Sequence, residues 1–477
     1  MTRSLMLGTA AFFTACTSYH SYDQKGAYAT APSEPEMLED DPQDPTTACE
    51  SEEPVVLYAS PDDSNSMSSP MQAWHDIESG TEPFNPIRTW EFFNYATWDY
   101  PAAEPGQLSV DLQLAQGDAP GTYAMQVGIS SERIDPLQRA PMVLTFSVDQ
   151  SGSMGGKPIR RVKDSLEVIA SQLRPGDIVN LIGWSENRHR ILEGHTILGP
   201  NDPVFLSAIR SLSTNGGTDL AGGLKAAYRL TEKHWVPGRI HRVVLLSDGG
   251  ANIGVTDGEL IGTKAGAVDE DGIYLIEVGV GHGSWYNDRL MNEVTDLGKG
   301  AAVFIPTRAA AEEVFGDRFL ESMSTSARDV QIRYDLPPGF RIERFSGEEI
   351  SEDRREIEPQ HVAPNDAVVL YQHLASCAEP DLSQRISVTV SYYDGLSFEP
   401  RSAVVSATLG ELLEGPNEQL LKGTALYAFT QTLMDAQDPL ENFDPSEARA
   451  TLDAALDVLP HDADLLRIQQ GLDTLGL

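Results

Sequence analysis

The sequence predicts an α/β domain with a doubly wound, mostly parallel sheet, inserted in a flanking β-sandwich-like domain and followed by a C-terminal helical tail. Three observations support this fold class. Short apolar runs alternate with helical stretches between residues 141 and 326, strands of alternating hydrophobicity lie on both sides of that region, and apolar residues take a helical spacing after residue 409. A chain of 477 residues is long enough to bury the cores of several such units.

The amino terminus has the pattern of a secretory signal. Residues 1–15 contain one charge, Arg3, and an apolar stretch far shorter than the roughly 20 residues of a membrane span. The stretch ends in Phe13-Thr14-Ala15-Cys16, which resembles the lipobox of bacterial lipoproteins. This resemblance implies that Cys16 is lipidated and anchors the chain in the cell envelope, and the absence of Asp at the next position favours the outer membrane. An ordinary signal peptide is the alternative.

Three cysteines occur, Cys16, Cys49 and Cys377, and none forms a C-x-x-C pair, so a thiolate metal site is not expected. If Cys16 carries the lipid, the other two lie in an oxidising compartment. Cys49 and Cys377 then either pair in a disulfide or remain free thiols, and the sequence leaves both alternatives open.

Residues 16–85 are predicted to form a disordered acidic tether. Positions 17–85 contain 15 acidic residues and one lysine, a net charge of −14, together with many Pro and Ser residues. We expect too few apolar positions here to offset the entropy of ordering the chain.

Two β segments, residues 86–140 and 327–409, flank the central region. Each contains runs in which apolar and polar residues alternate, the pattern of half-buried antiparallel strands. Asp394-Gly395 follows the last of these runs and indicates a hairpin. We expect the two segments to form one sandwich-like domain interrupted by an insertion. The runs are Gln107–Leu114, Tyr123–Ile129, Val330–Tyr334 and Ile386–Tyr392.

The insertion, residues 141–326, has five short apolar runs typical of a sheet that is buried on both faces. Helical stretches separate them, so the expected binding site lies at the carboxyl ends of the strands. The predicted strands are Met142–Val148, Ile178–Trp184, Val243–Ser247, Tyr274–Val280 and Ala302–Ile305. The predicted helices are Ile159–Leu173, Leu220–His234, Glu259–Val268, Asp288–Leu297 and Ala309–Ser326.

Residues 410–477 are predicted to be helical over Glu418–Met434, Pro445–Leu459 and Ala463–Leu475. No 34-residue repeat is present, and we interpret the region as a packing or docking tail. The aromatic residues between Trp90 and Tyr100 are either a ligand surface or, as we expect, core of the β domain.

The chemistry is concentrated at strand ends. Asp149, Ser151 and Ser153 directly follow the first strand of the insertion, Thr218 stands just before a helix, and Asp248 follows another strand. Five oxygen donors without nitrogen or sulfur favour Mg²⁺, Mn²⁺ or Ca²⁺ over zinc or copper. The structural alternative is a capped, Ser-rich turn together with an ordinary Asp-Gly turn.

This set of residues resembles the metal-ion-dependent adhesion site of von Willebrand factor A (VWA) domains, and the flanking segments look like bacterial VWA lipoproteins. The resemblance implies that Ser151 and Ser153 contact the metal directly, that Thr218 does so in the ligand-bound state, and that Asp149 and Asp248 hold coordinating waters. It also implies that a Glu or Asp of a protein partner completes the coordination. Ser247 stands where a Thr often precedes the second aspartate, which should not affect ligation.

Other classes of function fit less well. The net charge of −38 and the lack of a basic run argue against a nucleic-acid partner. Ser151 stands where a nucleophile elbow needs its first Gly, and also where a phosphate-binding loop needs one. We therefore do not expect an enzyme.

The prediction for function is a lipid-anchored envelope protein that binds a protein partner through a divalent cation, Mg²⁺ first. The first alternative is a structural envelope scaffold, in which the β domain and helical tail make the contacts and the metal only stabilises the VWA fold. A further alternative is metal-assisted hydrolysis through a bound water.

Overall fold

The structure is a computed structural model, and it describes residues 53–61, 65–117, 119–186, 188–249, 272–281, 286, 295, 300–377, 379–437 and 444–477. The predicted signal peptide, Cys16, Cys49 and the helices predicted at Glu259–Val268 and Asp288–Leu297 lie outside these residues, Thr295 apart. None of the helices in the described part of the chain is both long and apolar enough to cross a membrane.

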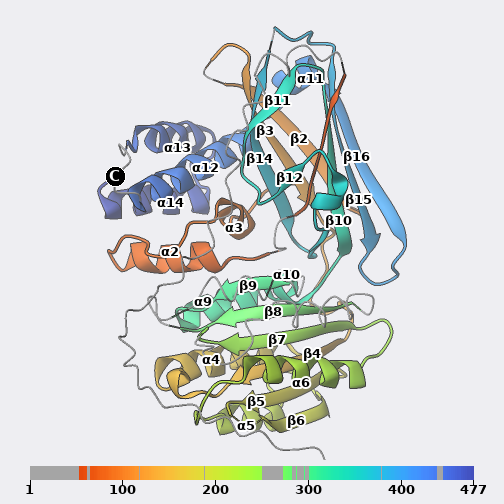
Figure 1. The fold of residues 1–477 in the computed structure, drawn as a ribbon, viewed down its shortest axis with the longest axis vertical. Helices are drawn as coiled ribbons and strands as arrows, with labels where there is room; N and C mark the ends of the chain where they lie inside the picture. Colours follow the sequence, from red (N-terminus) through yellow and green to blue (C-terminus); the bar gives the residue numbers. More distant parts are fainter. Residues whose placement is uncertain are drawn as a thin grey trace, which may run out of the picture. The chain divides into compact units, whose positions relative to one another are not determined.

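The inserted region forms a six-stranded sheet in the order β6-β5-β4-β7-β8-β9 (Figure 1). All neighbouring strands are parallel except β6, which pairs antiparallel with β5. Strands β4, β7 and β8 are buried along their whole length, as expected for a sheet covered on both faces. β6 was not predicted, because its exposed edge carries mostly polar residues. The strands are β4 Met142–Asp149, β5 Ile178–Trp184, β6 Arg188–Thr196, β7 Ile240–Ser247, β8 Ile273–Gly279 and β9 Ala301–Phe304.

Helix α6 packs on β4, β5 and β7, while α4 packs with α5 and α9. The last predicted helix, Ala309–Ser326, is instead three short pieces, because a π-helical turn interrupts it and it ends at Met323. The helical elements are η1 Gly152–Met154, α4 Lys157–Gln172, α5 Pro203–Ser211, α6 Leu220–Lys233, α9 Arg308–Glu312, η4 Glu313–Asp317 and α10 Phe319–Met323.

Two antiparallel sheets flank the insertion, in the orders β12-β1-β10-β15-β16, with β13 also paired to β10, and β11-β14-β3-β2. β3 precedes the insertion and pairs with β14, which follows it, as an interrupted domain requires. Both sheets contribute to one buried apolar core. The strands are β1 Val55–Ala59, β2 Ser109–Gln116, β3 Thr122–Ser130, β10 Ala327–Leu336, β11 Phe340–Phe345, β12 Ile350–Ser351, β13 Gln360–Val362, β14 Ala367–Ser376, β15 Arg385–Asp394 and β16 Pro400–Thr408, with a short turn η5 at Arg354–Glu356.

The prediction of a disordered tether as far as Asn85 is wrong for β1 and α2, which lie within it. β1 pairs with β10, and α2, Ser68–Glu78, buries Met71, Trp74 and Ile77. The acidic composition of residues 17–85 hid these few apolar positions, which are stabilised by contacts with distant parts of the chain. Residues 66–67 also bond to the edge strand β9, where the Met67 N–H donates to the Ala302 carbonyl over 2.8 Å.

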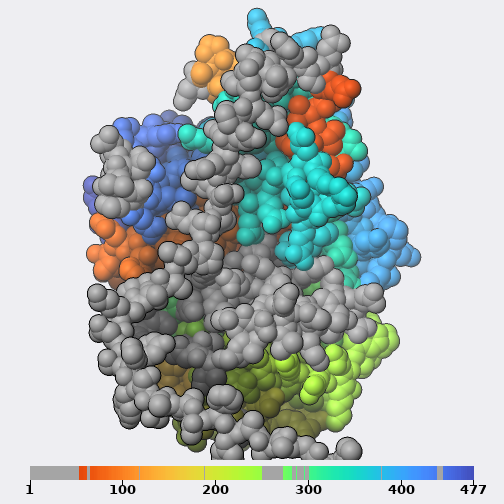
Figure 2. Space-filling view, viewed as in Figure 1, coloured from red at the N-terminus to blue at the C-terminus, as the bar shows by residue number. Residues whose placement is uncertain are grey.

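The three predicted C-terminal helices are present as α12 Glu418–Gln437, α13 Ser446–Val458 and α14 Ala463–Leu475, and a short helix that was not predicted, α11 Leu409–Leu413, precedes them. These helices belong to the core. The Phe429 ring of α12 stacks on Trp74 of α2 at 5.3 Å, and α14 also packs on α2. Figure 2 shows α2, in orange, and the C-terminal helices, in blue, forming one continuous surface.

The aromatic residues between Trp90 and Tyr100 were expected to be core of the β domain; most of them are buried, but in the core shared with the helices and not in the sandwich interior. Helix α3, Thr89–Tyr95, packs between α12 and the outer face of β14. Phe93 lies 5.6 Å from Trp98 and 6.2 Å from Tyr371 of β14 between ring centres. These rings therefore join the helices to the outside of the β domain.

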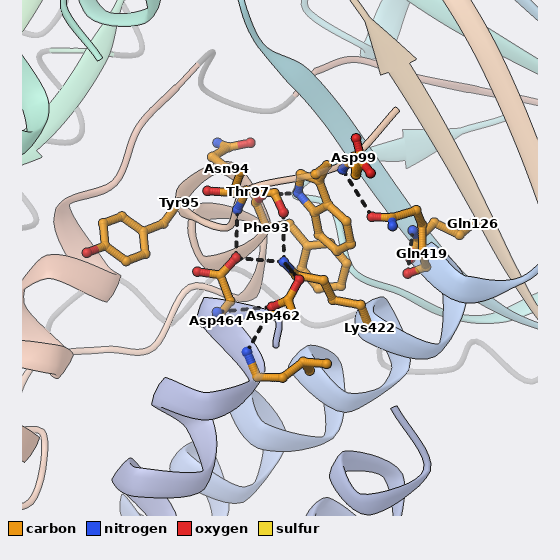
Figure 3. A network of polar contacts seen from close by, with 12 residues as sticks. Phe93, Asn94, Tyr95, Thr97, Asp99, Gln126, Gln419, Lys422, Asp462 and Asp464 are labelled. Atoms are coloured by element: carbon orange, nitrogen blue, oxygen red, sulfur yellow. Dashed lines mark hydrogen bonds and ion pairs between the residues drawn. The ribbon is translucent and has the colours of Figure 1, made fainter. Parts of the chain in front are cut away.

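A buried ion network fixes the segment after α3 to the C-terminal helices (Figure 3). The Lys422 ammonium, on a side chain that is only 2% exposed, lies 2.7 Å from both Asp462 and Asp464 and donates to the Thr97 carbonyl. The Thr97 N–H in turn donates to Asp464 over 2.8 Å. Elsewhere, Cys377 is disulfide-bonded. Its partner lies outside the described residues, so pairing with Cys49 stays a prediction.

Candidate metal centre

Asp149 is the last residue of β4 and is fully buried. The Ser151 N–H donates to its Oδ1 over 2.8 Å, and the Ser247 hydroxyl of the neighbouring strand β7 donates to its Oδ2 over 2.9 Å. Burial raises the pKa of this carboxyl to about 6; the two serines lower it, and the nearby Asp248 raises it. A cation beside Asp149 would remove the cost of keeping its charge buried.

Ser151 and Ser153 flank the first residue of the 3₁₀ turn η1. Their hydroxyl oxygens lie 3.0 Å apart, close enough to share one small cation. Ser151 is buried and Ser153 is exposed, while Met154 at the end of the turn is fully buried and anchors it. The turn thus places one buried and one exposed hydroxyl oxygen next to the buried carboxylate of Asp149.

The loop that carries Thr218 is tied to this turn by backbone hydrogen bonds. The Asn215 N–H donates to the Gln150 carbonyl over 2.6 Å, and the Gly152 N–H donates to the Gly216 carbonyl over 3.1 Å. Gly216 has a φ of +81°, which favours glycine at this bend. After Thr218, Asp219 caps α6 by accepting from the Gly222 N–H. Thr218 is therefore held at the same edge as the two serines.

Asp248 follows β7 and is largely buried. Since β4 and β7 are parallel neighbours, their carboxyl ends meet, which brings Asp248 close enough to Asp149 to raise the pKa of that carboxyl. Direct hydrogen bonds join Ser151 to both Asp149 and Ser153. The loop before α6 brings Thr218 to the same edge of the sheet, and strand β7 brings Asp248 there.

The donor set fits a hard divalent cation. It combines hydroxyl oxygens with two carboxylates, and the hydrogen bonds that Asp149 accepts come from the neutral donors Ser151 and Ser247. In the described part of the chain, no group of three or more His, Cys, Asp or Glu side chains is arranged to hold a metal. A zinc-type site is accordingly not seen there.

Sequence reasoning missed the part played by Ser247. Its hydroxyl donates to Asp149 and accepts from the Gly249 N–H over 3.2 Å, so it orients the buried carboxylate and the turn after β7. Its position one residue before Asp248 was visible, but the contact depends on the pairing of β4 with β7.

Part of the chain is similar to known proteins. Residues 144–251 match the family described as the von Willebrand factor type A domain. The chain is 26% identical over 291 residues to the uncharacterized protein YfbK of Escherichia coli, covering 58% of this chain and 49% of that protein. It is 29% identical over 157 residues to inter-alpha-trypsin inhibitor heavy chain H3 of Mesocricetus auratus, covering 32% and 18%.

Among solved structures, a von Willebrand factor type A protein from Catenulispora acidiphila matches with a TM-score of 0.45 and 14% identity, over 76% of this chain and 89% of that one. The chain is also 23% identical to the uncharacterized protein sll0103 of Synechocystis, over 48% of this chain and 53% of that protein. It thus spans about half the length of these two uncharacterized bacterial relatives. The family match and the sheet order together define a chain that contains a VWA domain of α/β fold.

Proposed function

We propose that this chain binds a protein partner through a divalent cation, with Mg²⁺ as the first candidate and Mn²⁺ or Ca²⁺ as alternatives. The observation that carries the proposal is the pair of serine hydroxyls, 3.0 Å apart at the edge of the sheet, above the buried carboxylate of Asp149. VWA domains commonly mediate protein interactions, which supports binding as the function of the domain.

Each residue has a defined role in this proposal. Ser151 and Ser153 contact the cation through their hydroxyls, and Thr218 joins them when a partner is bound. Asp149 and Asp248 hold water molecules and balance the 2+ charge. Because two carboxylates leave the centre nearly neutral, one further anionic oxygen can be accepted, and a Glu or Asp of the partner supplies it. The cation, when bound, acts as a Lewis acid that holds this carboxylate.

We also propose that Cys16 is lipidated and holds the protein at the cell envelope, in the outer membrane, with the acidic residues before β1 as the connection. The motif at Cys16 and the acidic composition that follows support this. We further propose that the domain binds without catalysis, because the serines of the site lack the sequence context of a nucleophile.

The test compares the wild type with Ser153→Ala, a change at an exposed ligand that leaves the core intact. Mg²⁺ titration by calorimetry should give saturable binding for the wild type and at least tenfold weaker binding for the variant, since one of few direct ligands is lost. Affinity capture from an envelope extract should retain partners with Mg²⁺ and lose them with chelator. Ser207→Ala, at an exposed serine of α5, serves as the matched control.

The scaffold alternative predicts a different result. Partners captured equally with Mg²⁺, with chelator and by Ser153→Ala would refute the cation-dependent proposal and favour contacts through the β domain and helices. Deleting the helical tail cannot make this distinction, because α12 and α14 contribute to the main core.

A further inference from the structure

Three basic residues lie on one face of α4 beside the metal centre. Lys157, Arg160 and Arg161 stand at i, i+3 and i+4, so their side chains share a face. Arg161 Nη1 donates to the Gly281 carbonyl over 3.0 Å. A Cβ on Gly281 would lie 3.2 Å from the Asp248 carbonyl, so this basic face adjoins the Asp248 side of the centre.

The charge of Lys157 does not stabilise the helix that carries it. The first turn of an α-helix favours acidic residues, but α4 has none there, and Lys157 lies in it. Lys157 and Arg160 are exposed and have no ion pair among the described residues. A bound cation would repel them further. A residue type that destabilises its own helix, as Lys157 does at the start of α4, indicates that the position serves a function.

An acidic residue lies on the opposite side of the centre. Glu186 is in the connection between β5 and β6, and in the sheet register Trp184 of β5 pairs with both Asp149 and Arg188. The connection is therefore at the same edge as Asp149, beyond the neighbouring strand β5. Gly217 directly precedes Thr218, and a Cβ placed on it would lie 3.3 Å from the Glu186 Oε1. The Glu186 carboxylate therefore lies against the loop that carries Thr218.

Glu186 is exposed and has no ion pair among the described residues. The nearby Arg188 is already engaged, since it lies 3.6 Å from Asp219 and donates to the Gly222 carbonyl over 3.3 Å. Among the described residues, the charges without an ion pair near the candidate metal centre are thus separated by sign, with Lys157 and Arg160 on one side and Glu186 on the other.

We infer that the partner segment is dipolar, with further acidic groups on the α4 side of its metal-bound carboxylate and a basic group on the side of Glu186. This inference rests on the proposed function and deepens it. A chain of net charge −38 repels acidic segments in general, so a local basic face is needed for one to approach. Separated charges also fix the direction in which the segment lies across the centre.

The test uses the full chain and three synthetic peptides with one central Glu. One peptide has two Asp on one side and two Lys on the other, one has Asp on both sides, and one has Lys on both sides. Binding is measured by fluorescence anisotropy with Mg²⁺ and with chelator. We expect the wild type to prefer the dipolar peptide about three- to tenfold over the other two, as a few exposed charge pairs allow.

Charge reversal should change this preference in opposite ways. Lys157→Glu/Arg160→Glu should bind the Lys-flanked peptide best, and Glu186→Lys should bind the Asp-flanked peptide best. Arg229→Glu and Glu232→Lys, two changes on α6, are the matched controls and should behave as wild type.

The outcomes separate the inference from the proposed function. Mg²⁺-dependent binding with the same order of preference in every variant overturns the inference and leaves the proposed function standing. No Mg²⁺-dependent binding of any peptide by the wild type overturns both.

Discussion

At the residue scale, the candidate metal centre is built on a buried carboxylate and the groups that orient it. Asp149 has no exposed surface and accepts hydrogen bonds from the Ser151 amide and the Ser247 hydroxyl. The residues that we propose as ligands could be nominated from the sequence, because each stands shortly after a predicted strand or just before a predicted helix. Ser247 was not predictable as an orienting group, because its hydroxyl reaches Asp149 only when β7 pairs with β4.

A second carboxyl, Asp366, gives a prediction on pH. It lies in the turn before β14, where the Ala367 N–H donates to it over 2.8 Å, and it lines a cavity of about 540 Å³ together with Arg318 and Glu321. Burial, and next the charge of Glu321, raise its pKa to about 7, while Arg318 opposes the shift.

The sign of the effect follows from proton binding. Between the ordinary Asp pKa of 3.8 and about 7, the folded protein keeps a proton that the unfolded chain releases. This contribution to the free energy of unfolding is fully present below the ordinary pKa of 3.8 and is lost as the pH rises through the folded-state pKa of about 7.

Asp366→Asn cannot ionise and keeps the acceptor for Ala367. We therefore expect its unfolding temperature, relative to the wild type, to rise steadily between about pH 4 and pH 7 and then level off. Thermal unfolding of both proteins across this range measures the difference. A constant difference at every pH would contradict the raised pKa.

At the element scale, close packing overrides local preference. Helix α6 contains Gly222-Gly223 near its start, although glycine weakens helices. A Cβ on Gly223 would lie 2.5 Å from the Trp184 ring, so only glycine lets α6 approach β5 this closely. Since Asp219 caps α6 right after Thr218, this approach also positions a proposed metal ligand.

The buried Lys422 network should contribute to the stability of the fold. Lys422→Met on α12 leaves Asp462 and Asp464 at the start of α14 without their cation and removes a donor to Thr97. Breaking a buried ion pair on one side costs about 3–5 kcal/mol, and we expect a loss of this size in the free energy of unfolding.

Urea unfolding measures this loss. The control is the triple variant Lys422→Met/Asp462→Asn/Asp464→Asn, which removes the charges together and should recover much of the lost stability. A single variant as stable as the wild type would contradict the burial of this network.

At the scale of the whole molecule, the first and last described segments of the chain pack on each other and on its middle part. Segments before β2 pair with β10 and pack on α14, and β3 pairs with β14 across the inserted VWA domain. The helical tail, interpreted from sequence as a packing or docking element, contributes its apolar residues to the main core.

Two neighbouring residues of α14 test this role. Leu465 is fully buried and Leu466 is 43% exposed. Leu465→Asp should destabilise the protein by more than about 3 kcal/mol, because it buries an unpaired charge, whereas Leu466→Asp should change stability by less than about 0.5 kcal/mol. Thermal unfolding with a tertiary probe such as near-UV circular dichroism compares them. Equal behaviour of the two variants would show that α14 is a docking tail and not core.

The sequence by itself determined the alternation of strands and helices in the VWA domain, the three long C-terminal helices, and the oxygen donors that we propose as ligands. These features are local, because each is written in the periodicity or the residues of one segment. Only the tertiary structure decided that β1 and α2 form, that Ser247 orients Asp149, and that Lys422 is buried against Thr97, 325 residues away. The physical reason is that these depend on contacts between distant segments, whose burial and charge pairing no single stretch of sequence contains.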